Sequence, residues 1–254
     1  MQIQIEHKSI IGTRADQQDA YYVSSSEDKA FAVVCDGMGG TAGGEVASKT
    51  AVNKLRELID NKDPIEPFPL FFLRAIDILD ECVVTINKQF GSEGSGTTIA
   101  AATIEKGCLY WLAVGDSRIY IVRGDEIVQA TRDHNYALRL DHWTAEEQKT
   151  EQALPGNHRS DALISYIGIG GIRIFDINEK PFSLFPGDLV LLTTDGLTNT
   201  LTNNEIMSQL TANQYPKRLD MLFETVSKKQ PGVQDNTTCV LLHIANGGIT
   251  DVCE

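Results

Sequence analysis

The chain has 254 residues, of which 42% are hydrophobic, so we expect one domain with a large core over residues 1–245 and a flexible tail over 246–254. Its formal net charge of −13 repels phosphate backbones and anionic lipid headgroups, so nucleic acids and membrane surfaces are excluded as expected partners. The five cysteines form no Cys-x-x-Cys pair, and no signal segment or apolar stretch of ~20 residues is present, which predicts a soluble, cytoplasmic monomer.

Apolar runs typical of buried strands recur along the chain, at 30–35, 98–104, 109–114, 118–122, 188–193 and 237–244. Nearly every residue from Leu109 to Val114 is apolar, so both faces of this strand must be covered. A half-exposed sheet would alternate apolar and polar residues instead. The pattern therefore predicts stacked sheets with an outer layer of helices.

Two helices, consecutive in the chain, are predicted over Glu45–Ile59 and Leu70–Phe90 by apolar residues spaced three and four apart. Capping-box patterns that begin at Thr144 and Thr202 predict two more helix starts, and a last helix is expected over 217–228. The polar segment at approximately 133–170 is expected to be a surface flap. Because strands and helices come in blocks, the fold class is α+β, with the elements arranged as a sandwich.

Four aspartates stand at the ends or turns of apolar strands: Asp36, Asp116, Asp195 and Asp235. A strand end holds a carboxylate rigidly, and the glycines that follow Asp36 and Asp195 leave room for a metal ion. Oxygen ligands without neighbouring Cys or His favour Mg²⁺ or Mn²⁺ over zinc. The alternative is that each Asp-Gly pair is ordinary turn chemistry, which is the commoner explanation of any single pair.

Seven short motifs, in order and spread over almost the whole chain, resemble those of the PP2C-type (PPM) family of metal-dependent protein serine/threonine phosphatases, and of its bacterial branch in particular. They are Arg14-Ala-Asp-Gln-Gln-Asp19, Asp36-Gly-Met-Gly-Gly40, Gly96-Thr-Thr98, Val114-Gly-Asp-Ser-Arg118, Thr131-Arg-Asp-His134, Asp195-Gly-Leu-Thr198 and Asp235-Asn-Thr-Thr238. The resemblance implies a four-layer α-β-β-α sandwich, in which two packed antiparallel sheets are flanked by helix pairs.

The resemblance also implies two Mn²⁺ or Mg²⁺ ions and a water or hydroxide that they activate to attack phosphorus. Asp36 would bridge the ions, the Gly37 carbonyl would bind one of them, and Asp195 and Asp235 would hold the other. Asp19 would orient metal-bound waters, and Asp116 would contribute to a third, looser metal site.

Arg14 matches the family's phosphate-binding arginine and joins Asp36, Asp195 and Asp235 in the expected catalytic set. The alternative for Arg14 is a surface ion pair. The implied partners are phosphorylated serine/threonine proteins and the pathway of an opposing kinase.

The chain departs from the family pattern at three motif positions. Gln18 stands where many relatives have Glu, which predicts weaker binding of the second ion. Met38 and Thr41 replace histidines of other family members, so the general acid is unassigned. His134 is the nearest candidate, although a structural role is the commoner one for a histidine in a turn.

Two other functions compete with this interpretation. The stretch from Gly37 to Ala42 fits a dinucleotide-binding fingerprint, but the proline-rich linker after Ile59 replaces the second strand that such a unit needs. A weak or inactive PP2C-like domain that binds phosphoproteins or regulates a partner is also open, because fold alone does not guarantee activity. Against this alternative, a binding module has little reason to keep so many costly acidic residues.

Overall fold

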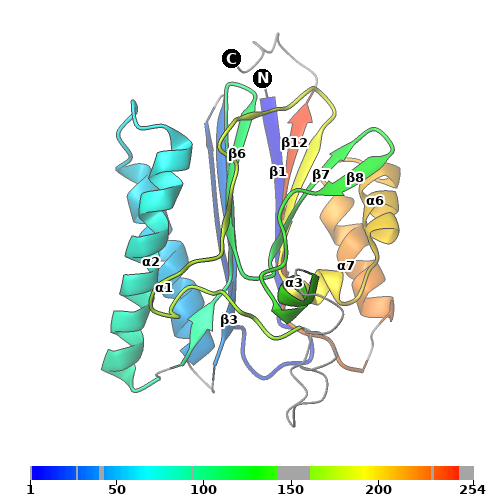
Figure 1. Ribbon diagram of the computed structural model, residues 1–254. Helices are drawn as coiled ribbons and strands as arrows, with labels where there is room; N and C mark the ends of the chain where they lie inside the picture. The colour runs from blue at the N-terminus through cyan, green and yellow to red at the C-terminus, as the bar shows by residue number, and fades with distance from the viewer. Residues whose placement is uncertain are drawn as a thin grey trace.

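The computed structural model describes residues 2–26, 28–39, 43–92, 94–141, 161–229 and 232–245. The elements form four layers (Figure 1), with helices α1 (Gly43–Asp60) and α2 (Phe68–Phe90) on one side and α6 (Asn203–Ala212) and α7 (Arg218–Lys229) on the other. Two sheets lie between the helix pairs, and all their described strand pairs are antiparallel. The predicted four-layer α+β sandwich is confirmed.

The first sheet packs against α6 and α7, and its strands in spatial order are β1 (Gln2–Ile10), β12 (Thr237–Ala245), β11 (Leu189–Thr193), β7 (Arg118–Arg123) and β8 (Glu126–Gln129). The second sheet packs against α1 and α2 in the order β10 (Phe182–Ser183), β6 (Cys108–Val114), β5 (Ile99–Glu105), β3 (Lys29–Met38) and β2 (Asp19–Ser26). Two short strands extend it: β4 (Gly96–Thr97) pairs with β3, and β9 (Asp176–Ile177) pairs with β6. Short helices α3 (Tyr136–Asp141) and α5 (Asp195–Thr198) follow β8 and β11.

Three hydrophobic cores separate the four layers, and the strand pleat decides which core each side chain enters. In β3, Phe31 and Val33 pack toward α1 and α2, whereas Ala32 and Val34 pack toward the other sheet. Leu192 of β11 likewise enters the core between the sheets. Because successive side chains of a strand point to opposite faces, both faces must be apolar. The continuous apolar runs in the sequence have this cause.

Every predicted strand is observed, within about three residues at each end, but the sequence analysis does not predict the two-residue strands β4, β9 and β10 or the longer strands β1, β2 and β8. The three longer strands are edge strands, so their outer side chains face solvent more often and their apolar signal is weak. The capping box of α6 is confirmed, since the Thr202 hydroxyl accepts from the Glu205 amide and the Glu205 carboxylate accepts from the Thr202 amide at 2.8 Å.

Several expectations concern residues outside the described ranges: the capping box at 144–147, most of the flap, and the tail over 246–254. The described ends of the flap are joined to each other, because the Tyr136 amide donates to the Ala162 carbonyl at 2.8 Å. Cys35 and Cys239 are buried free thiols, whereas Cys108 is half-buried and disulfide-bonded. Among the described helices, none combines the length and apolarity that crossing a bilayer requires.

The core between the sheets gives the first testable prediction. Leu242 of β12 is fully buried there, so Leu242→Ala is expected to lower the free energy of unfolding by about 2–5 kcal/mol. The control, Leu73→Ala on α2, changes a side chain that is 47% exposed and should cost less than about 0.5 kcal/mol. Urea denaturation measures both values, and equal losses would contradict the assignment of Leu242 to the core.

Candidate active site

Five aspartates from distant parts of the chain meet at one edge of the two sheets. Asp19 begins β2 and lies opposite Asp36 of β3 in the strand register. Asp195 follows β11, Asp235 precedes β12, and Asp116 lies in the turn between β6 and β7. Repulsion between their charges links Asp36 to Asp19, Asp116 and Asp195, and links Asp195 to Asp235. The structure therefore brings the predicted acidic residues together.

The carboxyl groups of Asp36 and Asp195 lie close enough for each to affect the pKa of the other. Burial raises the pKa of Asp36 well above its usual value, and the charges of Asp19 and Asp195 raise it further. Burial also raises the pKa of Asp195, with Asp235 adding to the effect. Without a cation, burial and mutual repulsion disfavour the charged forms of these two carboxyl groups.

Asp19 is buried directly behind this pair. Its Oδ2 atom accepts from the Thr194 hydroxyl at 2.8 Å, but burial still raises its pKa to about 7. Its Oδ1 atom and the Oδ1 atom of Asp195 are buried with no hydrogen-bond partner among the described residues. Buried carboxylate oxygens without partners are costly, and hard cations bind such oxygens, so these residues fit a divalent metal ion.

Two glycines allow the backbone to come close at this edge. A Cβ atom on Gly37 would lie 2.1 Å from the carbonyl oxygen of Gly44, at the start of α1, and one on Gly196 would lie 2.0 Å from the carbonyl oxygen of Asn236. Any larger residue would therefore separate β3 from α1 or α5 from the segment before β12. The Asp-Gly pairs have a structural requirement of their own, beyond ordinary turn formation.

Arg14 lies in the loop between β1 and β2, and its Nη2 atom donates to Asp235 Oδ2 at 2.5 Å. The loop is tied down where the Thr13 amide donates to the Gln234 carbonyl at 2.8 Å. Arg14 thus forms the exposed ion pair that was the alternative to phosphate binding. The pair also keeps a guanidinium group at the edge where the aspartates meet.

Several polar residues that the sequence did not assign a role hold the aspartates in place. The Thr98 hydroxyl accepts from the Asp36 amide at 2.9 Å and lies 2.6 Å from the Ser117 hydroxyl, next to Asp116. The Asn236 side chain accepts from the Gln18 amide at 2.7 Å and donates to carbonyls of the loop that carries Arg14. Their positions inside the recognised motifs were the only available signal.

His134 is fully buried and supports the turn that carries Asp116. Its Nδ1 atom accepts from the Gly115 amide at 3.1 Å, and its own amide donates to the Gly115 carbonyl at 2.9 Å. Arg118 supports the same turn through a two-pronged ion pair with Asp133, at 2.8 and 2.6 Å. These contacts favour the structural role of His134 over that of a general acid.

The acidic side chains are not arranged around a single point. Within the described ranges, no three His, Cys, Asp or Glu side chains are placed to hold one ion together. Asp195 accepts from the Asn199 side chain at 3.0 Å, and Asp235 is turned to Arg14. Asp36, Asp195 and Asp235 stand within electrostatic reach of one another, but their roles as ligands, like that of the Gly37 carbonyl, remain predictions.

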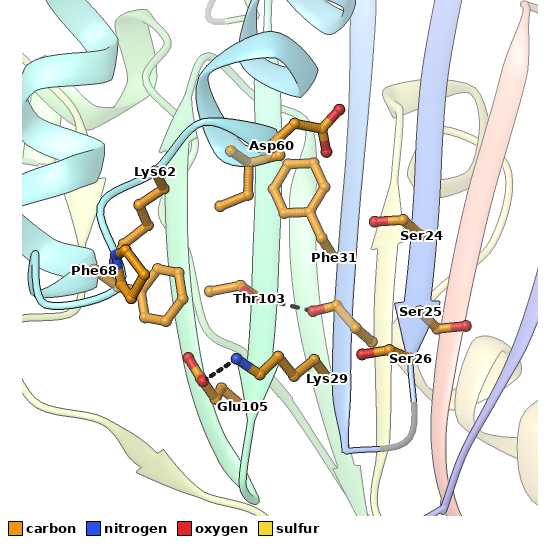
Figure 2. A pocket seen from close by; sticks show the side chains of 13 residues that line it. Ser24, Ser25, Ser26, Lys29, Phe31, Asp60, Lys62, Phe68, Thr103 and Glu105 are labelled. Carbon is orange, nitrogen blue, oxygen red and sulfur yellow. Dashed lines mark hydrogen bonds and ion pairs between the residues drawn. The ribbon is translucent and has the colours of Figure 1, made fainter.

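A pocket of about 360 Å³ lies at the opposite end of β2 and β3. Figure 2 shows serines of β2, the Phe31 and Phe68 rings, and the ion pair of Lys29 with Glu105 at 2.5 Å. Acidic and basic side chains are mixed in its lining, so it lacks the concentrated charge of the aspartate edge. The aspartate edge is therefore the candidate active site.

The chain resembles known bacterial phosphatases in sequence. The chain is 30% identical to the serine/threonine phosphatase stp of Listeria innocua over 235 residues, which are 90% of each chain. It is 28% identical to the protein phosphatase PhpP of Streptococcus pneumoniae over 79% of this chain and 80% of that one.

Solved structures share the fold. The serine/threonine phosphatase of S. agalactiae superposes with a TM-score of 0.80 at 26% identity, over 95% of this chain and 99% of that one. The catalytic domain of the phosphatase PstP, solved in complex with two manganese ions, gives a TM-score of 0.70 at 24% identity, over 96% and 99%. The family model for protein phosphatase 2C matches residues 8–241, and the chain therefore belongs to the protein phosphatase 2C family.

Proposed function

We propose that the protein is a protein phosphatase that hydrolyses phosphoserine and phosphothreonine with water activated by two Mn²⁺ or Mg²⁺ ions. The observation that supports this most is the pair of buried, unpartnered oxygens of Asp19 and Asp195 among five converging aspartates. The names of the bacterial relatives and the two manganese ions of the PstP structure agree with it.

In this proposal Asp36, the Gly37 carbonyl, Asp195 and Asp235 hold the two ions. Asp19 orients the waters around them, and Asp116 serves a third ion. Divalent ions at such a site make water a nucleophile near neutral pH and offset the charge of the phosphate. The sheet strands and the close backbone contacts of Gly37 and Gly196 keep the carboxylates in place, so little reorganisation is needed when substrate binds.

Arg14 binds the substrate phosphate in this proposal. Its planar guanidinium group can donate to two phosphate oxygens at once. Its ion pair with Asp235 involves a side chain that is 60% exposed, and exposed pairs contribute at most about 1 kcal/mol. Replacing Asp235 with a substrate phosphate as the partner of Arg14 therefore costs little free energy. The replacement leaves Asp235 available to bind metal.

We also propose that one domain spans residues 1–245 and that the protein is a cytoplasmic monomer that opposes a serine/threonine kinase. The alternative function is a weak or inactive domain that binds phosphoproteins. The specific observation in its favour is that Asp235 already has Arg14 as an ion-pair partner.

Hydrolysis of p-nitrophenyl phosphate and of a phosphothreonine peptide, with and without Mn²⁺, separates the two functions. We expect turnover that depends on Mn²⁺ and falls by about a hundredfold or more in Asp36→Asn, because a ligand of both ions is lost. Asp125→Asn, in the exposed turn between β7 and β8, makes the same change outside the site and should retain activity. Absence of metal-dependent turnover in the wild type would favour the binding domain.

The buried aspartates predict that the folding stability of the metal-free protein depends on pH in an unusual way. Asp19 and Asp116 have pKa values of about 7 in the folded state, against 3.8 for an ordinary aspartate, in both cases chiefly because of burial. Between these values the folded state binds more protons than the unfolded state. Their contribution to stability is therefore full below pH 3.8 and is lost as the pH rises through about 7.

The measurement is the melting temperature in EDTA from pH 5 to pH 8. We expect it to fall more steeply in the wild type than in the double variant Asp19→Asn, Asp116→Asn, which has no such protons to lose. At pH 8, Mn²⁺ at a hundred times its Kd should stabilise the wild type by about 2.7 kcal/mol. Parallel pH curves for the two proteins would contradict the assigned pKa values.

Gln18 provides a test of metal affinity. Its backbone carbonyl accepts from the Ser48 hydroxyl at 2.6 Å and the Gly37 amide at 3.1 Å, so Glu at this position should keep the backbone in place. The added negative charge is expected to lower the Mn²⁺ concentration for half-maximal activity by about tenfold. Gln214→Glu adds the same charge in the loop between α6 and α7 and should leave that concentration unchanged. No change in Gln18→Glu would refute the role of this position.

A further inference from the structure

Asp80 is a buried carboxylate outside the group of five aspartates, and it shapes the loop that follows the flap. Asp80 of α2 is 5% exposed, and its oxygens accept three backbone amides, from Gly168 at 2.7 Å, Gly170 at 3.3 Å and Gly171 at 2.6 Å. Successive amides that converge on one anion form a nest. Hydrogen bonds to a charged acceptor are stronger than neutral ones, so Asp80 determines the shape of this loop.

The loop needs its glycines to wrap around Asp80. Gly168, Gly170 and Gly171 have φ angles of 102°, 83° and 112°, which other residues rarely adopt. Between them, Ile169 is turned outward and is 41% exposed.

Ile169 forms one wall of a pocket of about 230 Å³. The other described lining residues are Ile164, Ser165, Gly171, Ile172, Arg173 and Ile174. The Ser165 hydroxyl donates to the Ile174 carbonyl at 2.6 Å, so the two ends of the lining segment are fastened to each other. Arg173 is exposed and forms no ion pair with a described residue, so its charge lies free at the rim. We refer to this lining as the isoleucine pocket.

The isoleucine pocket is connected to the candidate active site by two short routes. The Ile164 amide donates to the His134 carbonyl at 3.0 Å, and His134 in turn holds the Gly115 turn that carries Asp116. Ile167 pairs with Thr97 through hydrogen bonds of 3.0 and 2.8 Å, and β4 pairs with Gly37 and Met38. In Figure 1 the chain after 161 runs from α3 across the end of the sheets to α2.

We propose that the isoleucine pocket is a substrate subsite that takes one apolar side chain near the phosphorylated residue of the protein substrate. The inference rests on the proposed phosphatase function and specifies its substrate class. Four isoleucines around a space of this size favour a branched or aromatic side chain. Because the pocket is joined to the Asp116 turn by hydrogen bonds, the proposed source of that side chain is the peptide that carries the phosphate. Asp80 acts as a positioning residue, because its hydrogen bonds to Gly168, Gly170 and Gly171 fix the backbone on both sides of Ile169.

The test uses phosphothreonine peptides in which a single leucine is moved along both sides of the phosphothreonine in a serine background. With the Mn²⁺-loaded protein, we expect leucine at one position to raise kcat/KM by about tenfold over serine, mainly through KM. Each value is divided by the same protein's turnover of p-nitrophenyl phosphate, which has no peptide to fill the pocket.

Two pairs of variants separate the pocket from general effects on folding. Ile169→Ser removes an exposed pocket wall, and Leu73→Ser removes a similarly exposed leucine of α2, 47% exposed. Asp80→Asn keeps one acceptor oxygen but turns an NH₂ group toward the Gly171 amide, whereas Asp77→Asn makes the same change on the exposed face of α2. Ile169→Ser and Asp80→Asn should lose most of the preference for leucine, and both controls should keep it.

The outcomes distinguish the two proposals. A wild type that hydrolyses p-nitrophenyl phosphate but shows no leucine preference, or an Ile169→Ser variant that keeps it, overturns the subsite and leaves the phosphatase function standing. A wild type without metal-dependent turnover overturns the function itself. Should Asp80→Asn fail to fold by circular dichroism, the Ile169→Ser and Leu73→Ser pair decides the question alone.

Discussion

The concentration of like charge at one edge of the sheets is the constraint on which the rest of the structure depends. Isolated carboxylates turn away from each other into water, but here the strands β2 and β3 and the starts of α5 and β12 hold them together. The cost is visible in the raised pKa values of Asp19, Asp36, Asp116 and Asp195, each caused first by burial. A fold that tolerates this cost without a cation gains much from binding one.

The layered architecture supplies the stiffness that such a site requires. Each central strand is apolar on both faces, so it is clamped between two hydrophobic cores and its end has little freedom. The aspartates occupy strand ends and turns, where the adjoining strands fix the backbone. Close contacts at Gly37 and Gly196 then bring backbone from separate elements to the same edge. The same strands therefore both pack the hydrophobic cores and position the charged side chains.

Buried carboxylates in this protein are stabilised in two different ways. Asp80 is surrounded by three amide donors, which satisfy both of its oxygens without a cation. Asp19 and Asp195 each keep one buried oxygen that no described residue satisfies. This difference separates a carboxylate that shapes a loop from carboxylates suited to bind an ion, although all three residues are buried aspartates. The hydrogen-bond partners of a carboxylate therefore indicate its role better than its burial does.

The sequence by itself determined the central strands, the helix pairs, the four-layer class and the family, because buried strands need apolar residues on both faces and the motifs are local runs of a few residues. It did not predict the edge strands β1, β2 and β8, whose exposed sides weaken the apolar pattern. Only the tertiary structure decided the partners: Arg14 with Asp235, His134 with Gly115, and Asp80 with glycines about 90 residues away. Such pairings depend on how separate elements pack, and no local pattern of residues encodes which distant group a side chain will meet.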